Sequence, residues 1–528
     1  MRQRRYRLTR AQPGSEDIAL IGALDDRLWA PTTGDDWDLA WTVGMPPAAW
    51  FAHTAAQRLA NHIPGNGHLT VKSGLDRTLR ALQQRLIASQ GASSPLARHA
   101  RFAPQTFHLP GERAALLAAA AADPDQLWLQ KPANGARGEG IRVLRDPADA
   151  PDAPAAPDAP DARDASGASD WLVQAYLADP HLIDGRKYVL RLYVLISRLE
   201  PLRVYGYQQG FAKLASRPYT LDDLDDPFVH QTNPDVNAGN TAAADPVVFI
   251  DLERYRAHLE AEGADAQALF DRIHAQITMA VMAARDSMRT AAQSVGADQR
   301  GCFEFLGLDF LVDQALTPWL LECNLNPSLA TCAAPADGGD IEGRIKQRMV
   351  HDLVGLLGLN EPERPRADAN ATAAELQAEA AAELAAAGGF ERLYPRPDAP
   401  RYWPCFAYPR RADALLATSA PASAPANSQP ERLPPERLPP ERLPTFRPWR
   451  VREHIDDDGL QLYDETRQQW FAPNPTATLI WLHACNGLTP PQIAAELAEP
   501  PQARIEREVW ETLADWARDG LLTQRPAR

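Results

Sequence analysis

The stretch 305–328 is strongly apolar, and three of its few polar residues could act together: Asp309, Glu322 and Asn324. It is typical of two strands joined by a turn at 315–316, which places Asp309 opposite Glu322, about 5 Å away at Cβ. Asn324 then lies on the same sheet face. Two adjacent carboxylates repel unless a proton or cation lies between them, and an all-oxygen set suits Mg²⁺. We predict a magnesium site rather than a hairpin with one solvated face.

A second element that could bind an anion is the segment 127–141, LWLQKPANGARGEGI. It predicts a strand, a glycine-rich loop and a return strand, with Lys131 at the end of the first strand. Glycines such as Gly138 let the backbone approach a ligand, so the loop, with Lys131 and Arg137, could hold phosphates. A glycine-rich hairpin alone is weak evidence, and no helix with the GK[ST] signature follows. Its partnership with the acidic hairpin favours a nucleotide site.

A third set of charged residues lies in the segment 183–195, where Lys187, Val189 and Arg191 share one strand face by the period of two. An outer, solvated face would explain these charges equally well. Lys213 follows the next predicted strand. A polar cluster made of His230, Thr232 and Asn233 comes after an acidic loop.

Composition narrows the class of protein. The chain has 528 residues, room for two to four domains, and a net charge of −15, which argues against a general nucleic-acid binder. Residues 1–10 hold five arginines, so they could contact an acidic partner or form a frayed tail. The five cysteines show no CxxC spacing, no run of 18 apolar residues occurs, and we see no secretory signal. We therefore expect a cytoplasmic protein with free thiols.

Hydrophobic periodicity predicts the elements that would position these residues. Residues 1 to about 145 favour mixed α/β structure, and 146–170, rich in Asp and Pro, is typical of a disordered acidic insertion. We expect strands over 171–177, 189–196 and 202–208, with the last two joined by a hairpin through Ser197 to Pro201. We expect helices over 251–295 and 340–357.

The C-terminal part differs in composition. Residues 361–446 are typical of a linker, with a helix over about 371–387 and a thrice-repeated PERLP that favours extended, semi-rigid geometry. Residues 447–526 predict a hairpin (460–465 with 468–473) followed by three helices, a winged-helix-like layout. The acidic excess over 489–520 argues against DNA binding.

These segments together resemble the tubulin-tyrosine-ligase-like family, which has the ATP-grasp fold. The resemblance covers roughly residues 37–358, with GGFERLYP (388–395) as a possible trailing piece. Its motifs are AQRLANHIPGNGHLTVKSGL, FAPQTFHLP, QKPANGARGEGI, VQAYLADPHLIDGRKYVLRLYVLISRLEPLRVYGY, HQTN and FLGLDFLVDQALTPWLLECNLNPSL.

The resemblance implies ATP and Mg²⁺ as cofactors and a role for each candidate residue. The ATP-binding residues would be Lys131, Arg137, Gly138 and Lys187, with Gln174, Tyr176 and Leu177 on the adenine side. The catalytic residues would be Arg191, Lys213 and Asn233, with His230 and Thr232 lining the acceptor or amino-acid pocket. The metal ligands would be Asp309, Glu322 and Asn324. One departure is that this chain reads KYVLR where the family commonly reads KFDxR, so Val189 replaces an acid.

The C-terminal segment LQLYDETRQQWFAPNPTATLIWLHACNGLTPPQIAAEL resembles PqqD-like peptide-recognition domains, which bind a leader peptide as an added strand. The alternative is a generic winged-helix module. We therefore expect an α/β (α+β) ATP-grasp ligase followed by a Pro-rich linker and a small winged-helix-like domain. The expected regions are 1–110 (N-terminal), 111–360 (ATP-grasp central and C-terminal lobes), 361–446 (helix and linker) and 447–528 (peptide-binding).

The chemistry implied is activation of a carboxylate by ATP, followed by attack of an amine. The favoured substrate is a ribosomally made precursor peptide docked by the PqqD-like domain, with a free amino acid as second partner. Two alternatives remain: a tubulin-type ligase that adds amino acids to an acidic protein tail, and a non-catalytic ATP-grasp scaffold that binds peptide. We expect no nucleic-acid or membrane partner.

Overall fold

The computed structural model describes residues 3–10, 13–133, 138, 140–151, 171–243, 247–332, 339–361, 364–368, 370–408 and 410–417, with pieces at 444–446, 451–456, 459–464, 469–471, 480 and 522–524. The chain divides into two compact units. The first comprises Met1–Leu199, Val204–Arg366 and Ala381–Leu393, and the second Glu200–Arg203, Ala367–Ala380 and Tyr394–Arg528. The predicted mixed α/β class is confirmed, since several sheets alternate with helices.

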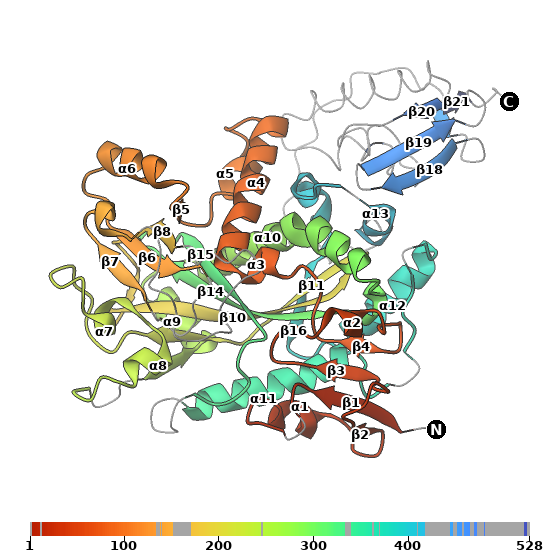
Figure 1. The fold of residues 1–528 in the computed structure, drawn as a ribbon, viewed down its shortest axis with the longest axis horizontal. Helices are drawn as coiled ribbons and strands as arrows, with labels where there is room; N and C mark the ends of the chain where they lie inside the picture. The colour runs from red at the N-terminus through yellow and green to blue at the C-terminus, as the bar shows by residue number, and fades with distance from the viewer. Residues whose placement is uncertain are drawn as a thin grey trace. The chain divides into compact units, whose positions relative to one another are not determined.

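The largest sheet is built around the long strand β10 (Arg186–Leu199) (Figure 1). Its strand order is β13-β12-β10-β11-β16, and β14 pairs with both β10 and β15 while β9 pairs with β10. The other strands are β9 (Leu182–Ile183), β11 (Leu202–Tyr207), β12 (Phe211–Leu214), β13 (Val248–Asp251), β14 (Glu304–Val312), β15 (Pro318–Leu325) and β16 (Phe390–Tyr394). The predicted hairpin over 305–328 is confirmed as β14 and β15, and the hairpin after 189–196 as β10 and β11.

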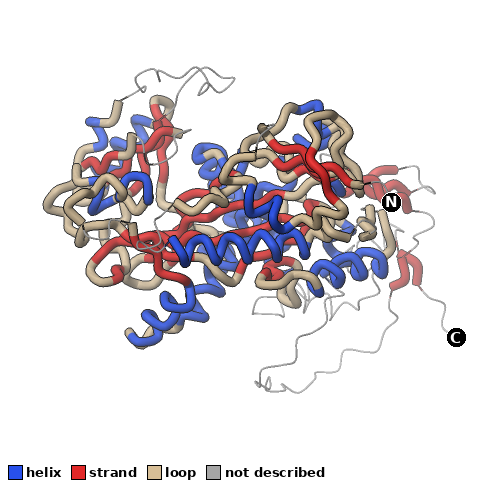
Figure 2. Tube along the Cα trace, turned by 90° about the horizontal axis from the view of Figure 1, so that it is seen from below, coloured by secondary structure: helices blue, strands red, loops and turns tan. Residues whose placement is uncertain are grey.

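Both faces of β10 are covered, which explains its nearly continuous apolar sequence. Tyr193 and Leu195 belong to a core cluster shared with helix α11 (Gly339–Leu356) on one face. On the other face, Tyr188 contacts Tyr255 of helix α9 (Leu252–Ala261). In Figure 2, α11 lies as a blue helix in front of the red strands of the sheet. The alternative of an outer, solvated face for Lys187 and Val189 is therefore wrong, because both side chains are buried.

The helical pattern predicted over 251–295 forms two helices, α9 and α10 (Ala266–Ser294), rather than one. The break has a local cause. Gly263 takes φ +79°, a conformation that favours glycine, and the Asp265 side chain accepts a hydrogen bond from the Ala268 N–H to cap α10. The helix predicted over 340–357 is confirmed as α11, and Gly358 follows it with φ +62°.

A separate four-stranded antiparallel sheet carries the glycine-rich segment. Its order is β5-β8-β6-β7, with β5 (Thr106–Leu109), β6 (Trp128–Pro132), β7 (Arg142–Leu144) and β8 (Trp171–Ala175). Phe107, Trp128 and Leu116 of helix α6 (Arg113–Ala122) share its core. The predicted strand, loop and return strand are thus β6 and β7. Most of the loop itself, including Arg137, and most of the predicted acidic insertion, at 152–170, lie outside the described residues.

The arginine-rich N-terminus is a sheet strand, so the prediction of a frayed tail is wrong. Strand β1 (Arg4–Leu8) lies inside a four-stranded parallel sheet, where Arg5 pairs with Asp36 and Arg7 with Asp35. Tyr6 and Leu8 alternate with these arginines along the strand and face the core. The sheet order is β2-β1-β3-β4, with β2 (Trp29–Pro31), β3 (Leu39–Trp41) and β4 (Leu59–Ala60).

The remaining helices are short, apart from α4 and α12. They are α1 (Ile18–Ala23), α2 (Ala48–Phe51), α3 (Gly67–Thr70), α4 (Lys72–Gln90), α5 (Pro95–His99), α7 (Pro227–His230), α8 (Pro234–Asn237), α12 (Ala373–Ala385) and α13 (Arg411–Ala417). None of the helices in the described part of the chain is long and apolar enough to cross a membrane. Among the described residues, Cys302, Cys323 and Cys332 are free thiols, as predicted.

Regular structure continues past residue 360, where the sequence predicts a linker. Helix α12 begins and ends close to the predicted 371–387, and its Glu379 accepts a hydrogen bond of 2.8 Å from the buried Arg203. Strand β16 then pairs at the edge of the main sheet beside β11. Tyr402 and Trp403, in a 3₁₀ segment (Ala399–Cys405), are buried. The PERLP repeats lie outside the described residues.

The C-terminal hairpin predicted over 460–473 is confirmed as β19 (Gly459–Asp464) and β20 (Gln469–Phe471). A further strand, β18 (Val451–Asp456), pairs with β19 on its other side. Strands β17 (Pro444–Phe446) and β21 (Leu522–Gln524) pair with each other. The three predicted helices after Asn474 lie outside the described residues apart from Ile480, so the winged-helix-like fold remains a prediction.

Candidate active site

A buried ionic cluster joins three neighbouring strands of the main sheet. Arg191 on β10 donates two hydrogen bonds to Asp309 on β14, from Nε to Oδ1 at 2.7 Å and from a terminal nitrogen to Oδ2 at 2.9 Å. Lys213 on β12 donates from Nζ to the same Oδ2 at 2.9 Å. Burial alone would raise the pKa of the Asp309 carboxyl, but Arg191 and Lys213 hold that pKa well below its usual range. One carboxylate thus pairs with two cations.

The predicted metal ligands converge beside this cluster. The β14–β15 register pairs Asp309 with Glu322, as predicted, and places Asn324 opposite Gly307. The Asn324 amide nitrogen lies 3.5 Å from Asp309 Oδ2 and 3.3 Å from Glu322 Oε1. Glu322 is partly exposed, and the Lys72 ammonium of α4 lies 3.5 Å from its Oε2.

This donor set fits a hard cation. Two carboxylates and a side-chain amide, whose oxygen can be turned inward by rotation of the amide group, are oxygen donors that Mg²⁺ accepts. Glu322 keeps a solvent-facing carboxylate, while both oxygens of Asp309 already accept hydrogen bonds from Arg191 and Lys213. A cation bound here would share Asp309 with these two residues.

Lys131 forms a second buried cationic position, on β6. Its Nζ donates to Gln174 Oε1 at 2.9 Å, and the Gln174 amide donates to Thr106 Oγ1 at 2.8 Å. Burial lowers the pKa of Lys131 to about 8, and the charge of Glu322 offsets this effect only in part. Within the described residues, the ammonium donates its one hydrogen bond to a neutral amide. Gln174, predicted on the adenine side, therefore holds the predicted phosphate-binding lysine in place.

Lys187 forms a third cationic position, on β10. Its Nζ donates to the Tyr176 hydroxyl at 3.1 Å and lies 4.4 Å from the centre of the Tyr176 ring. Burial lowers the pKa of Lys187 to about 7. The Tyr176 hydroxyl also contacts His230 Nδ1 at 2.9 Å, and His230 Nε2 lies 2.8 Å from the Asp223 carbonyl. Tyr176 can donate to Nδ1 while Nε2–H donates to the carbonyl, which requires a neutral imidazole; burial lowers the pKa of His230 accordingly.

The other predicted residues are less engaged with these clusters. Asn233 uses its side-chain oxygen to cap α8, accepting the Asp235 N–H at 2.8 Å. Thr232 is buried and Leu177 half-buried. Gly138 has φ +80°, a conformation that favours glycine, and a Cβ there would displace the side-chain amide of Gln231.

Sequence reasoning missed a charged stripe on α4. Lys72 faces Glu322, Asp76 binds His108 at 2.7 Å, and Arg80 donates to Glu112 at 2.7 Å and to the Thr106 carbonyl. The Thr106 hydroxyl accepts a hydrogen bond from the Gln174 amide, and Gln174 in turn accepts one from Lys131. Hydrogen bonds through Thr106 and Gln174 therefore link this stripe to Lys131. The spacing of four residues between Lys72, Asp76 and Arg80 is the signal that could have found it.

The sequence of the chain is similar to those of several known proteins. A sequence model of the tubulin-tyrosine ligase family matches residues 52–355. A human tubulin polyglutamylase is 31% identical over 334 residues, which are 61% of this chain and 24% of that protein. A mouse tubulin monoglutamylase is 29% identical, covering 62% of this chain and 26% of its own length. A probable alpha-tubulin polyglutamylase of Tetrahymena thermophila is 27% identical, with 61% and 78% covered. The chain thus spans about a quarter of the length of the first two relatives.

Proposed function

The chain belongs to the tubulin-tyrosine ligase family, and from this premise we propose that it is an ATP-dependent carboxylate–amine ligase that adds amino acids to an acidic protein tail. The reaction would transfer the γ-phosphoryl group of ATP to a carboxylate oxygen, giving an acyl-phosphate and ADP. An amino-acid amine would then attack the carbonyl carbon, lose a proton and expel phosphate as the amide forms. The observation that carries the proposal is the buried Arg191–Asp309–Lys213 cluster beside Glu322 and Asn324.

Lys131 and Lys187 suit the binding of ATP phosphates. Each is buried and hydrogen-bonded to a neutral side chain, so a bound anion would give each ammonium a directly bonded counter-charge. An anion would also raise the lowered pKa of both groups and keep them protonated. Gln174 and Tyr176 orient the two lysines. Arg137 and Gly138 remain proposed phosphate-loop residues and Leu177 a proposed adenine-side residue.

Arg191 and Lys213 suit the reacting carboxylate. Both donate to Asp309 from fixed, buried positions, and donors that are already oriented stabilise a developing oxyanion without reorganisation. His230, Thr232 and Asn233 remain proposed residues of the acceptor or amino-acid pocket. Asp309, Glu322 and Asn324 would hold Mg²⁺, which when bound neutralises charge that develops on the transferring phosphoryl group.

The proposed acceptor is an acidic protein tail rather than a ribosomal precursor peptide. The sequence resemblance to a PqqD-like domain favoured the precursor peptide, but the helices needed for that docking surface lie outside the described residues. The relatives are named for acting on tubulin, which supports the alternative interpretation of the sequence. The overall charge of −15 would slow encounter with an acidic tail, so local cations at the site must supply the attraction.

Mass spectrometry tests the proposal. The full chain would be incubated with ATP, Mg²⁺ and a pool of amino acids, with a glutamate-rich tail peptide in one reaction and a neutral peptide of equal length in another. We expect ATP-dependent mass increases of whole amino-acid residues on the acidic peptide alone. Glu322→Gln should abolish them, whereas His351→Ala, at an exposed position, should not. Nucleotide binding with no adduct on either peptide would favour a non-catalytic scaffold instead.

A further inference from the structure

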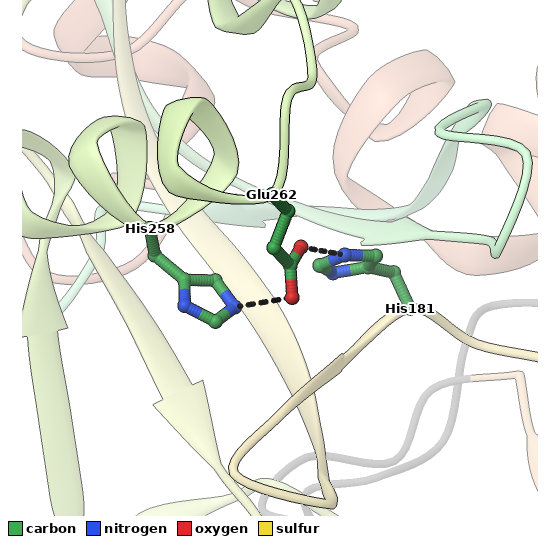
Figure 3. Close-up of side chains that lie close together, drawn as sticks. All are labelled: His181, His258 and Glu262. Carbon is green, nitrogen blue, oxygen red and sulfur yellow. Dashed lines mark hydrogen bonds and ion pairs between the residues drawn. The ribbon is translucent and has the colours of Figure 1, made fainter.

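Three potential metal ligands, His181, His258 and Glu262, lie close together away from the residues of the proposed active site (Figure 3). His181 lies in the segment that leads from β8 to β9, while His258 and Glu262 lie four residues apart on and just after α9. His181 Nε2 is 2.9 Å from one carboxylate oxygen of Glu262, and His258 Nε2 is 3.4 Å from the other. The ligand atoms all lie within 4.8 Å of one another.

The cluster is held in place from behind. The His181 backbone N–H donates to the Val312 carbonyl at 2.9 Å, and His181 Nδ1 lies 3.0 Å from the Tyr188 hydroxyl. That hydroxyl in turn contacts the Tyr255 hydroxyl at 2.8 Å. A histidine whose second ring nitrogen is fixed in this way presents the other nitrogen in one direction, which is the usual arrangement around metal-binding histidines. Here that direction is toward Glu262, as Figure 3 shows.

We propose that His181, His258 and Glu262 bind one divalent transition-metal ion of the zinc class. Two imidazole nitrogens and one carboxylate form a three-ligand set that leaves a fourth position for water. The Nε2 atom of His258 is shielded from solvent, yet within the described residues it makes no well-formed hydrogen bond, only the 3.4 Å contact with Glu262. A metal ion would satisfy this nitrogen and both histidines at once.

The nitrogen ligands separate this site from the proposed magnesium site. Imidazole suits zinc and its neighbours in the transition series, whereas Mg²⁺ selects oxygen ligands. Tyr188, which holds His181, also alternates along β10 with Lys187 and Val189, so the two sites lie on opposite faces of one strand. The ion would fasten the segment after β8, which begins with Tyr176, to α9, and would stabilise the folded chain by mass action. This inference does not depend on the proposed ligase activity.

Metal titration of the full chain tests the site. Protein stripped with a chelator would be titrated with Zn²⁺ against a zinc-binding dye, with His258→Ala compared to His351→Ala, whose histidine is exposed. We expect one tight zinc equivalent in the parent and in His351→Ala. We expect affinity to fall by about tenfold or more in His258→Ala, and by about tenfold in Tyr188→Phe, which removes the supporting hydroxyl. Zinc should raise the melting temperature of the parent but not of His258→Ala.

Two further measurements make the result decisive. His258→Ala and the parent should melt at the same temperature in chelator; if His258→Ala unfolds, His181→Gln takes its place. Co²⁺ bound at this site should show no thiolate-to-metal absorption, because the proposed ligands contain no sulfur. A thiolate band would place the ion on a cysteine such as the exposed Cys332. That band, or equal zinc affinity in parent and His258→Ala, or no zinc equivalent in the parent, would overturn the proposal.

Discussion

The buried cations of the proposed active site fall into two groups that differ in how their charge is compensated. Arg191 and Lys213 both donate to the carboxylate of Asp309. Lys131 and Lys187 donate to neutral partners, an amide and a phenol, and within the described residues neither makes an ion pair of 4 Å or less. Burial lowers the pKa of these two lysines to about 8 and about 7. A hydrogen-bonded carboxylate compensates the charges of the first group, whereas the described residues offer the second group no hydrogen-bonded carboxylate.

This difference in charge compensation suits the two groups of cations to two different tasks. A buried ammonium without a counter-ion costs folding free energy, which the binding of a phosphate would recover. Lys131 and Lys187 are therefore suited to bind an anion that arrives already charged. Arg191 and Lys213 are held at a fixed geometry by Asp309, and they suit a charge that develops only during the reaction. Asp309→Asn alters the first group, Lys187→Met and the pH titration probe the second, and Glu322→Gln changes a carboxylate beside both groups.

The largest effect is expected from Asp309→Asn. This change leaves two buried cations without their carboxylate and should lower the free energy of unfolding by about 3–5 kcal/mol. Urea denaturation, compared with Asp313→Asn at the end of the same hairpin, measures it. A loss smaller than that of the Asp313 variant would show that Arg191 and Lys213 do not depend on Asp309.

Lys187→Met is expected to change the free energy of unfolding in the opposite direction to Asp309→Asn, or not at all. Replacing a desolvated ammonium with an apolar side chain of similar length should leave stability unchanged or raise it by about 1–2 kcal/mol at pH 7. Nucleotide affinity, measured by calorimetry, should fall by about tenfold or more, since a charge-assisted contact is lost. Stability that drops as far as in Asp309→Asn would mean that Lys187 has a counter-ion after all.

A pH titration of stability examines the same lysine without a change of shape. In the unfolded chain Lys187 binds its proton up to pH 10.5, but in the folded chain only up to about 7. Between these values the unfolded state holds more protons, so stability should rise with pH. We expect Lys187→Met to reduce this slope by about 1 kcal/mol per pH unit between pH 7 and 9. Identical slopes in the two proteins would contradict the lowered pKa.

The smallest stability effect is expected from Glu322→Gln. Its carboxylate is partly exposed and its ion pair with Lys72 is 3.5 Å long, so removing the charge should change the free energy of unfolding by less than about 1 kcal/mol. The same variant should lose Mg²⁺-dependent nucleotide turnover. Thermal melting and a phosphate-release assay would measure the two effects separately. A variant with a lower melting temperature but normal phosphate release would contradict the role of Glu322 as a metal ligand.

What the sequence could predict depends on how far apart the contacting residues lie in the chain. The pairing of Asp309 with Glu322 follows from one local hairpin and the period of two, and it is confirmed. The pairing of Asp309 with Arg191 and Lys213 requires the strand order β12-β10-β14, which joins segments about a hundred residues apart and has no local signal. The contact of Tyr176 with His230 is hidden for the same reason.

Errors in the predicted elements have identifiable causes. The N-terminal arginines suggested a solvated tail, but Arg4 and Arg7 stack on the rings of Trp29 and Trp50 while Tyr6 and Leu8 face the core. The single helix predicted over 251–295 overlooked Gly263 and the capping Asp265, both of which are visible in the sequence. Strand β16 was missed because its partner strand lies nearly 190 residues earlier in the chain.

The central claim is that ATP activates a carboxylate before the amine attacks, and isotope transfer tests it most directly. An acidic peptide labelled with ¹⁸O in its side-chain carboxylates would be incubated with the full chain, ATP, Mg²⁺ and the amino acid that the mass-spectrometric assay identifies. An acyl-phosphate route predicts that each phosphate released carries one ¹⁸O atom from the peptide. Unlabelled phosphate released together with the amide product would contradict it.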